Sequence, residues 1–207
     1  RLLHTSSLRA DEAGPSMYLR SKGAGEAAVR DAAQGVALTV FRTSVVFGHR
    51  DRFLNLFALM QRYAPLVALG KPDAKLQPVW VEDVSRAFVN ALDEPRTFGN
   101  TYEIAGPRVY TLRELVEYAG RVSGHPRRVI GLPDSLAYLQ AWMLEFAPIE
   151  MLSRDNLDST RSDNVMSGSV AAELGVVPAA MEVVVPDYLS GQSSRERYMQ
   201  LRDHARR

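Results

Sequence analysis

The chain has 207 residues, of which 46% are hydrophobic and 24% are charged, as in an ordinary globular protein. Its 25 Lys and Arg residues nearly balance 24 Asp and Glu residues, and the net charge of +1 gives no electrostatic reason to expect a nucleic-acid partner. With no cysteine, the chain has no disulfides or thiolate ligands, and its four scattered histidines lack the spacing of a metal site.

Short β-rich runs alternate with helical patterns, which is typical of an α/β protein with a parallel sheet. The run from Leu2 to Ser7 is predicted to be a buried strand that ends in small hydroxyl side chains. Pro15 and Ser16 open a helix that continues to about Ala33. The clearest strand is predicted over residues 37–47.

The middle of the chain continues the alternation, with apolar residues at helical spacing from Phe53 to Tyr63. The pattern then predicts a strand, a helix and a strand, over Leu76 to Val81, Glu82 to Leu92 and Thr101 to Ala105. Thr111 is an expected N-cap, with Glu114 completing a capping box. The remainder is expected to be mainly helical, so a sheet-bearing part precedes a helical cap.

The residues that carry chemistry are Tyr18 and Lys22, which lie four positions apart at the start of a predicted helix and therefore on one helical face. A phenol, with an ordinary pKa of about 10, exchanges protons slowly at neutral pH unless a nearby cation stabilises the phenolate. The same ammonium can bind ribose hydroxyls. Ser6 or Ser7, at the end of the preceding strand, can hold the reacting oxygen.

Together with its context, this motif resembles the extended and atypical short-chain dehydrogenase/reductases, the NAD-dependent epimerase/dehydratase superfamily. The branch it resembles contains the NAD(P)-binding accessory Rossmann subunit of respiratory complex I and its bacterial relatives. The matching segments run from Ser6 to about Val165 and are YLRSKGAGEAAVRDA, SVVFGHRDRFLNLFALMQRYAP, LQPVWVEDVSRAFVNAL, YEIAGPRVYTLREL and EFAPIEMLSRDNLDSTRSDNV.

The resemblance implies a catalytic set of Tyr18, Lys22 and Ser6, which also contact an NAD or NADP cofactor together with Ser44, Val45 and Val46. It assigns residues 1–48 and 76–105 to the C-terminal part of a Rossmann domain, and residues 49–75 and 106–207 to a smaller, mainly helical substrate-side lobe. It also implies a cytoplasmic protein with a small-molecule substrate. A peripheral location at a membrane is the alternative to a cytoplasmic one. The partner implied is a membrane complex or a second copy of the chain.

The glycine-rich first turn of that family does not occur in this sequence, so we interpret the chain as the C-terminal part of a longer protein. By itself it is expected to be inactive and to bind NAD(P) weakly. Gly23 to Ala28 matches G-x-G-x-x-A but follows a helical segment, so we expect its glycines to allow close packing of the helix against the sheet. The alternatives to an oxidoreductase are a sugar-nucleotide epimerase or dehydratase, with Arg50, Arg52 and Arg62 as diphosphate ligands, and a non-catalytic cofactor-binding module.

Four further features are expected to be structural. Asp83 is interpreted as an N-cap or first-turn acid and Trp80 as a core residue or a cleft residue. The apolar stripe of Leu136, Leu139, Trp142, Met143 and Phe146 is expected to face a core, with a membrane or partner surface as the alternative. The basic tail, residues 195–207, is expected to be a solvated terminal helix.

Overall fold

The computed structural model describes residues 1–146 and 152–190. A parallel sheet in the order β1-β2-β7 is built from β1 (Leu2–Ser7), β2 (Leu38–Thr43) and β7 (Thr101–Ile104). Ser7 at the end of β1 lies opposite Thr43 at the end of β2, and Thr43 lies opposite Ile104. The three carboxyl ends therefore meet at one edge, and the predicted α/β class with a parallel sheet is confirmed.

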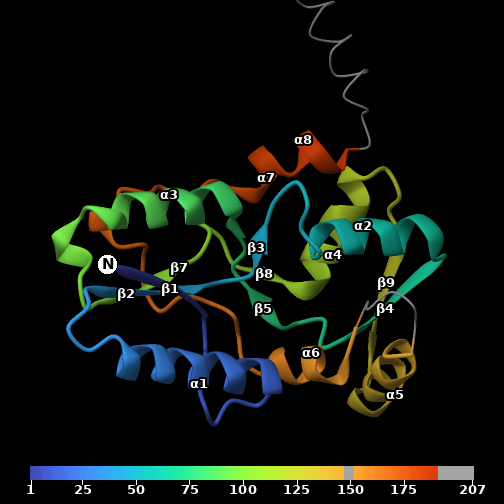
Figure 1. Ribbon diagram of the computed structural model, residues 1–207. Coiled ribbons are helices and arrows are strands. Elements are labelled where there is room, and N and C mark those ends of the chain that lie inside the picture. Colours follow the sequence, from blue (N-terminus) through green and yellow to red (C-terminus); the bar gives the residue numbers. More distant parts are fainter. Residues whose placement is uncertain (147–151, 191–207) are drawn as a thin grey trace, which may run out of the picture.

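Two helices cover opposite faces of this sheet, α1 (Met17–Ala32) and α3 (Val81–Leu92) (Figure 1). Strand β2 serves both faces because its side chains alternate. Val40 packs with Ala33 below the sheet, and Phe41 packs with Ala87 of α3 above it. The predicted start of α1 is confirmed, with the Ser16 side chain accepting a hydrogen bond from the Leu19 amide at 3.1 Å.

The strand predicted over residues 37–47 is interrupted. It divides into β2 and the short β3 (Val46–Phe47), which pairs with β6 (Val79–Trp80) and not with the main sheet. The interruption falls at Ser44 and Val45, where the Asn164 side chain binds both residues. The strand predicted from Leu76 to Val81 is also divided, into β5 (Lys75–Leu76) and β6.

A second region, made of the helices and strands in residues 54–76, 110–159 and 181–189, contains more strand than predicted. Strand β4 (Leu66–Gly70) pairs in parallel with β9 (Arg128–Leu132), and β5 pairs antiparallel with β8 (Tyr110–Thr111). The described part of the chain after residue 106 is mainly helical, as predicted, and contains in addition the unpredicted strands β8 and β9. The helices here are α2 (Leu54–Tyr63), α4 (Leu112–Val122), α5 (Asp134–Leu144), α6 (Arg154–Ser159), α7 (Met181–Val184) and α8 (Pro186–Leu189).

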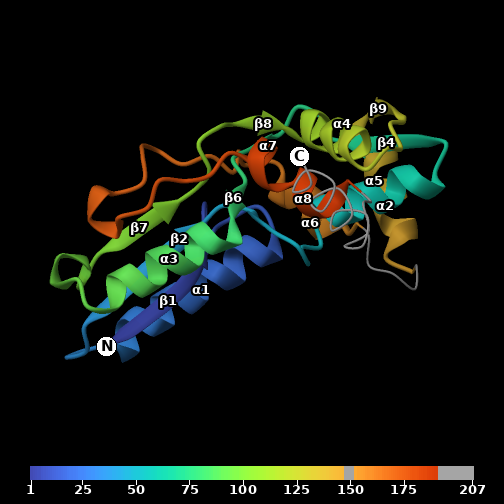
Figure 2. The same cartoon turned by 90° about the horizontal axis from the view of Figure 1, so that it is seen from above.

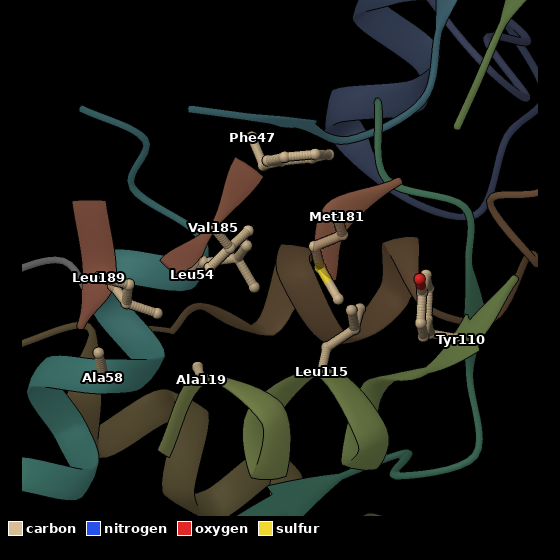
Figure 3. Close-up of a cluster of buried hydrophobic side chains, with 9 residues drawn as sticks. All are labelled: Phe47, Leu54, Ala58, Tyr110, Leu115, Ala119, Met181, Val185 and Leu189. Atoms are coloured by element: carbon tan, nitrogen blue, oxygen red, sulfur yellow. The ribbon is translucent and has the colours of Figure 1, made fainter. Parts of the chain in front are cut away.

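This region lies beside the sheet with its two helices and has its own core (Figure 2). Figure 3 shows that core, in which α2, α4, α7 and α8 enclose Phe47, Leu54, Ala58, Tyr110, Leu115, Ala119, Met181, Val185 and Leu189. Helix α4 begins with the predicted capping box, because Thr111 accepts from the Glu114 amide and Glu114 accepts from the Thr111 amide. The molecule therefore has a hydrophobic core between the sheet and α3 and another around α2 and α4.

The two glycines after Lys22 have different surroundings. A Cβ on Gly23 would lie 2.5 Å from backbone atoms of Asp11 and Glu12, whereas a Cβ on Gly25 would meet nothing within 4 Å. Gly23 therefore lets the loop after β1 approach α1. The predicted packing of both glycines against the sheet is wrong, because the close contact of Gly23 is with this loop.

Gly23→Ala is expected to destabilise the protein by about 1–3 kcal/mol, because the added methyl would displace backbone atoms that cannot rotate away. Gly25→Ala is the matched control and is expected to stabilise by about 0.5–1 kcal/mol, because alanine favours a helix interior. Urea unfolding of both variants measures the two free energies. Equal stability of the two variants would contradict the contact.

Candidate functional site

A cleft of about 800 Å³ opens at the carboxyl ends of β1 and β2. Ser7 is the last residue of β1, Ser44 and Val45 follow β2, and Tyr18 lies in the first turn of α1. The opposite wall comes from α2, β4 and α5 of the second region. Open parallel sheets bind ligands at this edge, where the strand ends and following loops leave space. The cleft is therefore the candidate functional site.

Tyr18 and Lys22 lie together on α1, as their spacing predicts. The Tyr18 side chain borders the cleft and is 47% exposed. The Lys22 ammonium lies 6.0 Å from the centre of the Tyr18 ring. Tyr18 thus borders the cleft, and Lys22 lies beside its ring one helical turn further along α1.

The serine doublet divides between two faces of β1. Ser7 lines the cleft, and its hydroxyl donates to the Leu8 carbonyl at 3.2 Å. Ser6 is buried outside the cleft lining; its hydroxyl lies near Glu26 of α1, although no hydrogen bond of normal geometry forms between them. Successive side chains of a strand point to opposite faces. The geometry favours Ser7 over Ser6 for contact with a bound substrate.

The residues after β2 are held by a distant asparagine. Asn164 Oδ1 accepts from the Ser44 hydroxyl at 2.5 Å and from the Val45 amide at 3.2 Å, and its backbone pairs with Lys75 and Gln77. Ser44 and Val45 consequently face the cleft, while Val46 packs against the buried cluster around Phe41. Sequence reasoning included Val46 in the pocket and did not identify Asn164, whose only signal was the resembling segment RSDNV.

Helix α6 fixes the start of α1 and hence the position of Tyr18. The Asp155 carboxylate accepts from the amides of Met17 at 2.6 Å and Tyr18 at 3.1 Å, and the Ser159 hydroxyl donates to Ser16 at 2.8 Å. A carboxylate at these free amides is stabilised by the helix dipole. Asp155 was also missed from the sequence, because the contact spans 137 positions.

A buried ion pair anchors the other end of the motif to the sheet. Glu26 is 3% exposed, and its carboxylate accepts from the Arg42 guanidinium at 2.8 and 3.0 Å and from Arg30 at 2.8 Å. Burial alone would raise the pKa of Glu26, but the hydrogen bonds from Arg42 and Arg30 outweigh it and lower the pKa to about 2. The bridge joins α1, which carries Tyr18, to β2, which Ser44 follows.

This bridge predicts a specific acid sensitivity. The pKa of Glu26 falls from 4.5 to about 2 on folding, so its stabilisation is present above pH 4.5 and is lost as the pH falls towards 2. The full loss is about 3 kcal/mol. Urea unfolding between pH 7 and pH 3 should therefore show a shallower decline in Glu26→Gln than in the unmodified protein. Glu12→Gln, at an exposed carboxylate, is the control, and identical slopes for all three proteins would contradict the role of Glu26.

Two motifs of the resembling branch hold backbone segments in place through side-chain hydrogen bonds. Asp51 accepts from the amides of Gly48, Phe53 and Asn55 at 2.8–3.2 Å and so sets the start of α2. Gln77 donates to the Gly106 carbonyl at 2.7 Å and accepts from the Met166 amide at 3.0 Å. Both side chains organise backbone beside the cleft.

Asp83 and Trp80 are structural, in line with the interpretation from sequence. Asp83 is fully buried in the first turn of α3, pairs with Arg86 and accepts from the Ala179 amide at 2.7 Å. Trp80 packs against the core of the second region and lies 5.6 Å from the Arg86 guanidinium. Neither residue lines the cleft.

The apolar stripe on α5 does not face a core, contrary to expectation. Its members are 46–74% exposed, and α5 buries its small residues Ala137 and Ala141 instead. The basic tail, residues 195–207, lies outside the described residues. Within residues 1–146 and 152–190, no acidic and histidine side chains gather as a metal site would require, and no helix is long and apolar enough to cross a membrane.

The hydroxyl groups at the cleft, with the Lys22 ammonium beside Tyr18, fit part of a dinucleotide. Tyr18 and Lys22 offer donors for a ribose, and Val45 gives an apolar contact for a nicotinamide ring. The strand, glycine-rich turn and helix that hold a pyrophosphate do not occur in this sequence. The described site thus suits the nicotinamide end of NAD or NADP and does not choose between them.

The fold and this strand-end cleft define a protein of the Rossmann type. The chain aligns with the NADPH-dependent quinone oxidoreductase of Escherichia coli at a TM-score of 0.68 and 17% identity, covering 90% of this chain and 64% of that one. The UDP-glucose 4-epimerase of Thermotoga maritima aligns at a TM-score of 0.62 and 15% identity, covering 96% and 63%. No protein-family model matches the chain.

Two further proteins are similar to this chain in sequence. The mitochondrial NADH dehydrogenase [ubiquinone] 1 alpha subcomplex subunit 9 of Mus musculus is 35% identical over 191 residues, which are 88% of this chain and 49% of that protein. The ceramide reductase of Caulobacter vibrioides is 35% identical over 137 residues, or 65% and 42%. The chain is a homologue of the subunit 9 proteins and shares its fold with the quinone oxidoreductase and the epimerase. It spans about half the length of the curated relatives it matches.

Proposed function

We propose that the protein is an NAD(P)-dependent oxidoreductase of the complex I accessory-subunit type. The observation that carries the proposal is the placement of Tyr18 at the cleft, with Lys22 beside its ring and hydroxyl side chains at the adjoining strand ends. A bound nicotinamide supplies or accepts hydride in this class of reaction. The residues of the chain then have to manage the proton and the substrate oxygen.

Each of these residues has a distinct role. Tyr18 gives its phenolic proton to a carbonyl oxygen, or takes the proton of an alcohol in the reverse direction. Lys22 stabilises the phenolate and binds the ribose hydroxyls. Ser7 lies on the cleft face of β1 and holds the substrate oxygen, in place of the Ser6 expected from sequence. Asp155 and Glu26 are positioning residues, because they fix the two halves of the helix that carries Tyr18 and Lys22.

The names of the similar proteins support the cofactor and the chemistry. The mouse relative is named a subunit of an NADH dehydrogenase, the Caulobacter relative a reductase, and the Escherichia coli structure is a complex with NADPH. We propose nicotinamide-nucleotide binding by this protein, with NAD and NADP both open. We also propose association with a membrane complex, by analogy with the mouse relative, and a peripheral location at a membrane.

A sugar-nucleotide epimerase or dehydratase is the second candidate, supported by the shared fold of the UDP-glucose 4-epimerase. Such an enzyme needs cations to hold a diphosphate. Of Arg50, Arg52 and Arg62, Arg52 lines the cleft, while Arg62 lies over the ring of Tyr63. Arg9 and Lys75 line the cleft as well, so the cations do not decide between the two candidates; the apolar wall from α2, β4 and α5 favours the oxidoreductase.

The test uses the natural full-length protein incubated with NADH or NADPH and panels of ketones, quinones and sugar nucleotides. Loss of the nicotinamide absorbance with a ketone or quinone supports the oxidoreductase. Conversion of a sugar nucleotide without net cofactor oxidation supports the epimerase. Tight cofactor binding without turnover of any panel member would leave a cofactor with a structural role and would overturn the proposal.

A further inference from the structure

The cleft beyond Tyr18 is apolar along one continuous wall. Its lining side chains come from α2, β4 and α5, with Leu152 from the segment before α6. They include Leu56, Phe57, Met60, Leu69, Leu144 and Leu152. A cleft of about 800 Å³ is within the ordinary size of small-molecule sites. Tyr18 lines the same cleft, so a substrate that reaches Tyr18 can also contact this wall.

Two of these leucines, Leu56 and Leu144, are not part of a hydrophobic core cluster of the described residues. Phe57 and Met60 pack in part against buried clusters, whereas Leu56 and Leu144 belong to none of the buried clusters within the described residues. Both are only partly buried, and both border the cleft. Apolar surface left facing a cavity gains free energy when an apolar ligand covers it. Leu56 and Leu144 are therefore the side chains that a ligand would contact.

Three charged groups of the lining, Arg9, Asp155 and Glu145, are engaged with the chain itself. Arg9 donates to the carbonyls of Asp163 and Val165 at 3.2 and 3.3 Å, and Asp155 accepts from the start of α1. Glu145 pairs with Arg154 at 3.0 Å. Groups committed in this way are less available to a diphosphate, and the remaining cations of the lining are Arg52 and Lys75.

We propose that the substrate is a ketone or aldehyde, or the corresponding alcohol, that carries an unbranched apolar chain; this rests on the proposed oxidoreductase function. The carbonyl lies at Tyr18 and the chain lies along Leu56 and Leu144. In the reductive direction the carbonyl carbon accepts hydride from NAD(P)H, which is oxidised. The carbonyl oxygen accepts the Tyr18 proton as the C=O π bond breaks, and solvent restores that proton.

One polar atom in the apolar wall adds a finer feature. Gln140 lines the cleft and donates to the Ala68 carbonyl at 3.2 Å, while its Oε1 is buried without a hydrogen-bond partner among the described residues. A buried acceptor without a donor is costly. The oxygen is itself buried, so it offers no polar surface to a chain lying along this wall.

The binding test titrates the natural full-length protein with a series of 2-alkanones from butanone to dodecanone, with calorimetric detection. Affinity is expected to rise about fourfold for each added methylene until the cleft is filled. UDP-glucose is the polar comparison and is expected to bind more weakly than 2-dodecanone. Affinity that stays flat along the series, or tighter binding of UDP-glucose, would overturn the proposal.

Matched variants test whether the alkyl chain of the ligand lies in the cleft. Leu56→Gln and Leu144→Gln are each expected to weaken 2-dodecanone binding at least tenfold, because each puts an amide on the apolar path. Leu59→Gln on α2 and Leu139→Gln on α5 alter exposed leucines outside the cleft and should leave the affinity unchanged. Circular dichroism confirms that all four variants fold. Equal effects in cleft and control variants would contradict the assignment.

The same probes separate this proposal from the proposed function. Tyr18→Phe should retain 2-dodecanone binding while losing its reduction. Chain-length-dependent binding without reduction by the unmodified protein would overturn the oxidoreductase and leave the apolar site standing. Reduction of carbonyl compounds with no preference for long chains would overturn the substrate class and leave the oxidoreductase standing.

Discussion

Tyr18→Phe is expected to lower turnover by about 10²–10⁴-fold while leaving the affinity for NAD(P)H nearly unchanged. The substitution removes the phenolic proton and keeps the ring that borders the cleft beside the Lys22 ammonium. Steady-state kinetics with a reducible ketone measures the rate, and cofactor titration measures the affinity.

Tyr63→Phe is the control for this change. Tyr63 is 75% exposed on α2 and lies outside the cleft lining, so its hydroxyl should be dispensable. Undiminished turnover in Tyr18→Phe would show that Tyr18 does not transfer the proton. The cleft would then remain a binding site without its assigned acid.

Lys22→Ala should affect both the cofactor affinity and the rate. The ammonium has two roles, hydrogen bonding to the ribose and stabilising the Tyr18 phenolate. A hydrogen bond to a charged group contributes about 1.5–3 kcal/mol, so the cofactor Kd should rise about tenfold to a hundredfold. Turnover at saturating cofactor should fall as well, because the phenolate loses its neighbouring charge.

Lys71→Ala removes a lysine that pairs with Asp134 at 2.7 Å and lies outside the cleft lining. It should change neither the Kd nor the rate. If Lys22→Ala binds the cofactor as tightly as Lys71→Ala does, Lys22 is a surface residue and the assignment of the ribose site is wrong.

Local signals predicted the sheet and its first helix well. The alternation of β-rich runs and helical patterns gave β1, β2 and β7, and capping residues marked the starts of α1 and α4. The pair of β4 and β9 was missed because each strand has five residues and their partners are 62 positions apart in register. Short apolar runs of this kind do not distinguish strand from helix until the partner is known.

Some residues of the candidate site could likewise be predicted from local sequence, and others could not. Tyr18 and Lys22 could be predicted because a single helix brings them together. Asn164 and Asp155 could not, because their contacts join segments more than a hundred positions apart. The choice between Ser6 and Ser7 depends on which face of β1 meets the cleft, and a doublet of identical residues carries no pattern of period two.

The central claim is that this cleft supports hydride transfer between a nicotinamide nucleotide and a carbonyl carbon. The most direct measurement follows deuterium from NADH and NADPH labelled at C4 of the nicotinamide, with the natural full-length protein and 2-dodecanone. We predict a deuterium atom at the carbinol carbon of 2-dodecanol, and little product with Tyr18→Phe. Bound cofactor that keeps its label, with no alcohol formed from this or any shorter ketone, would contradict the account.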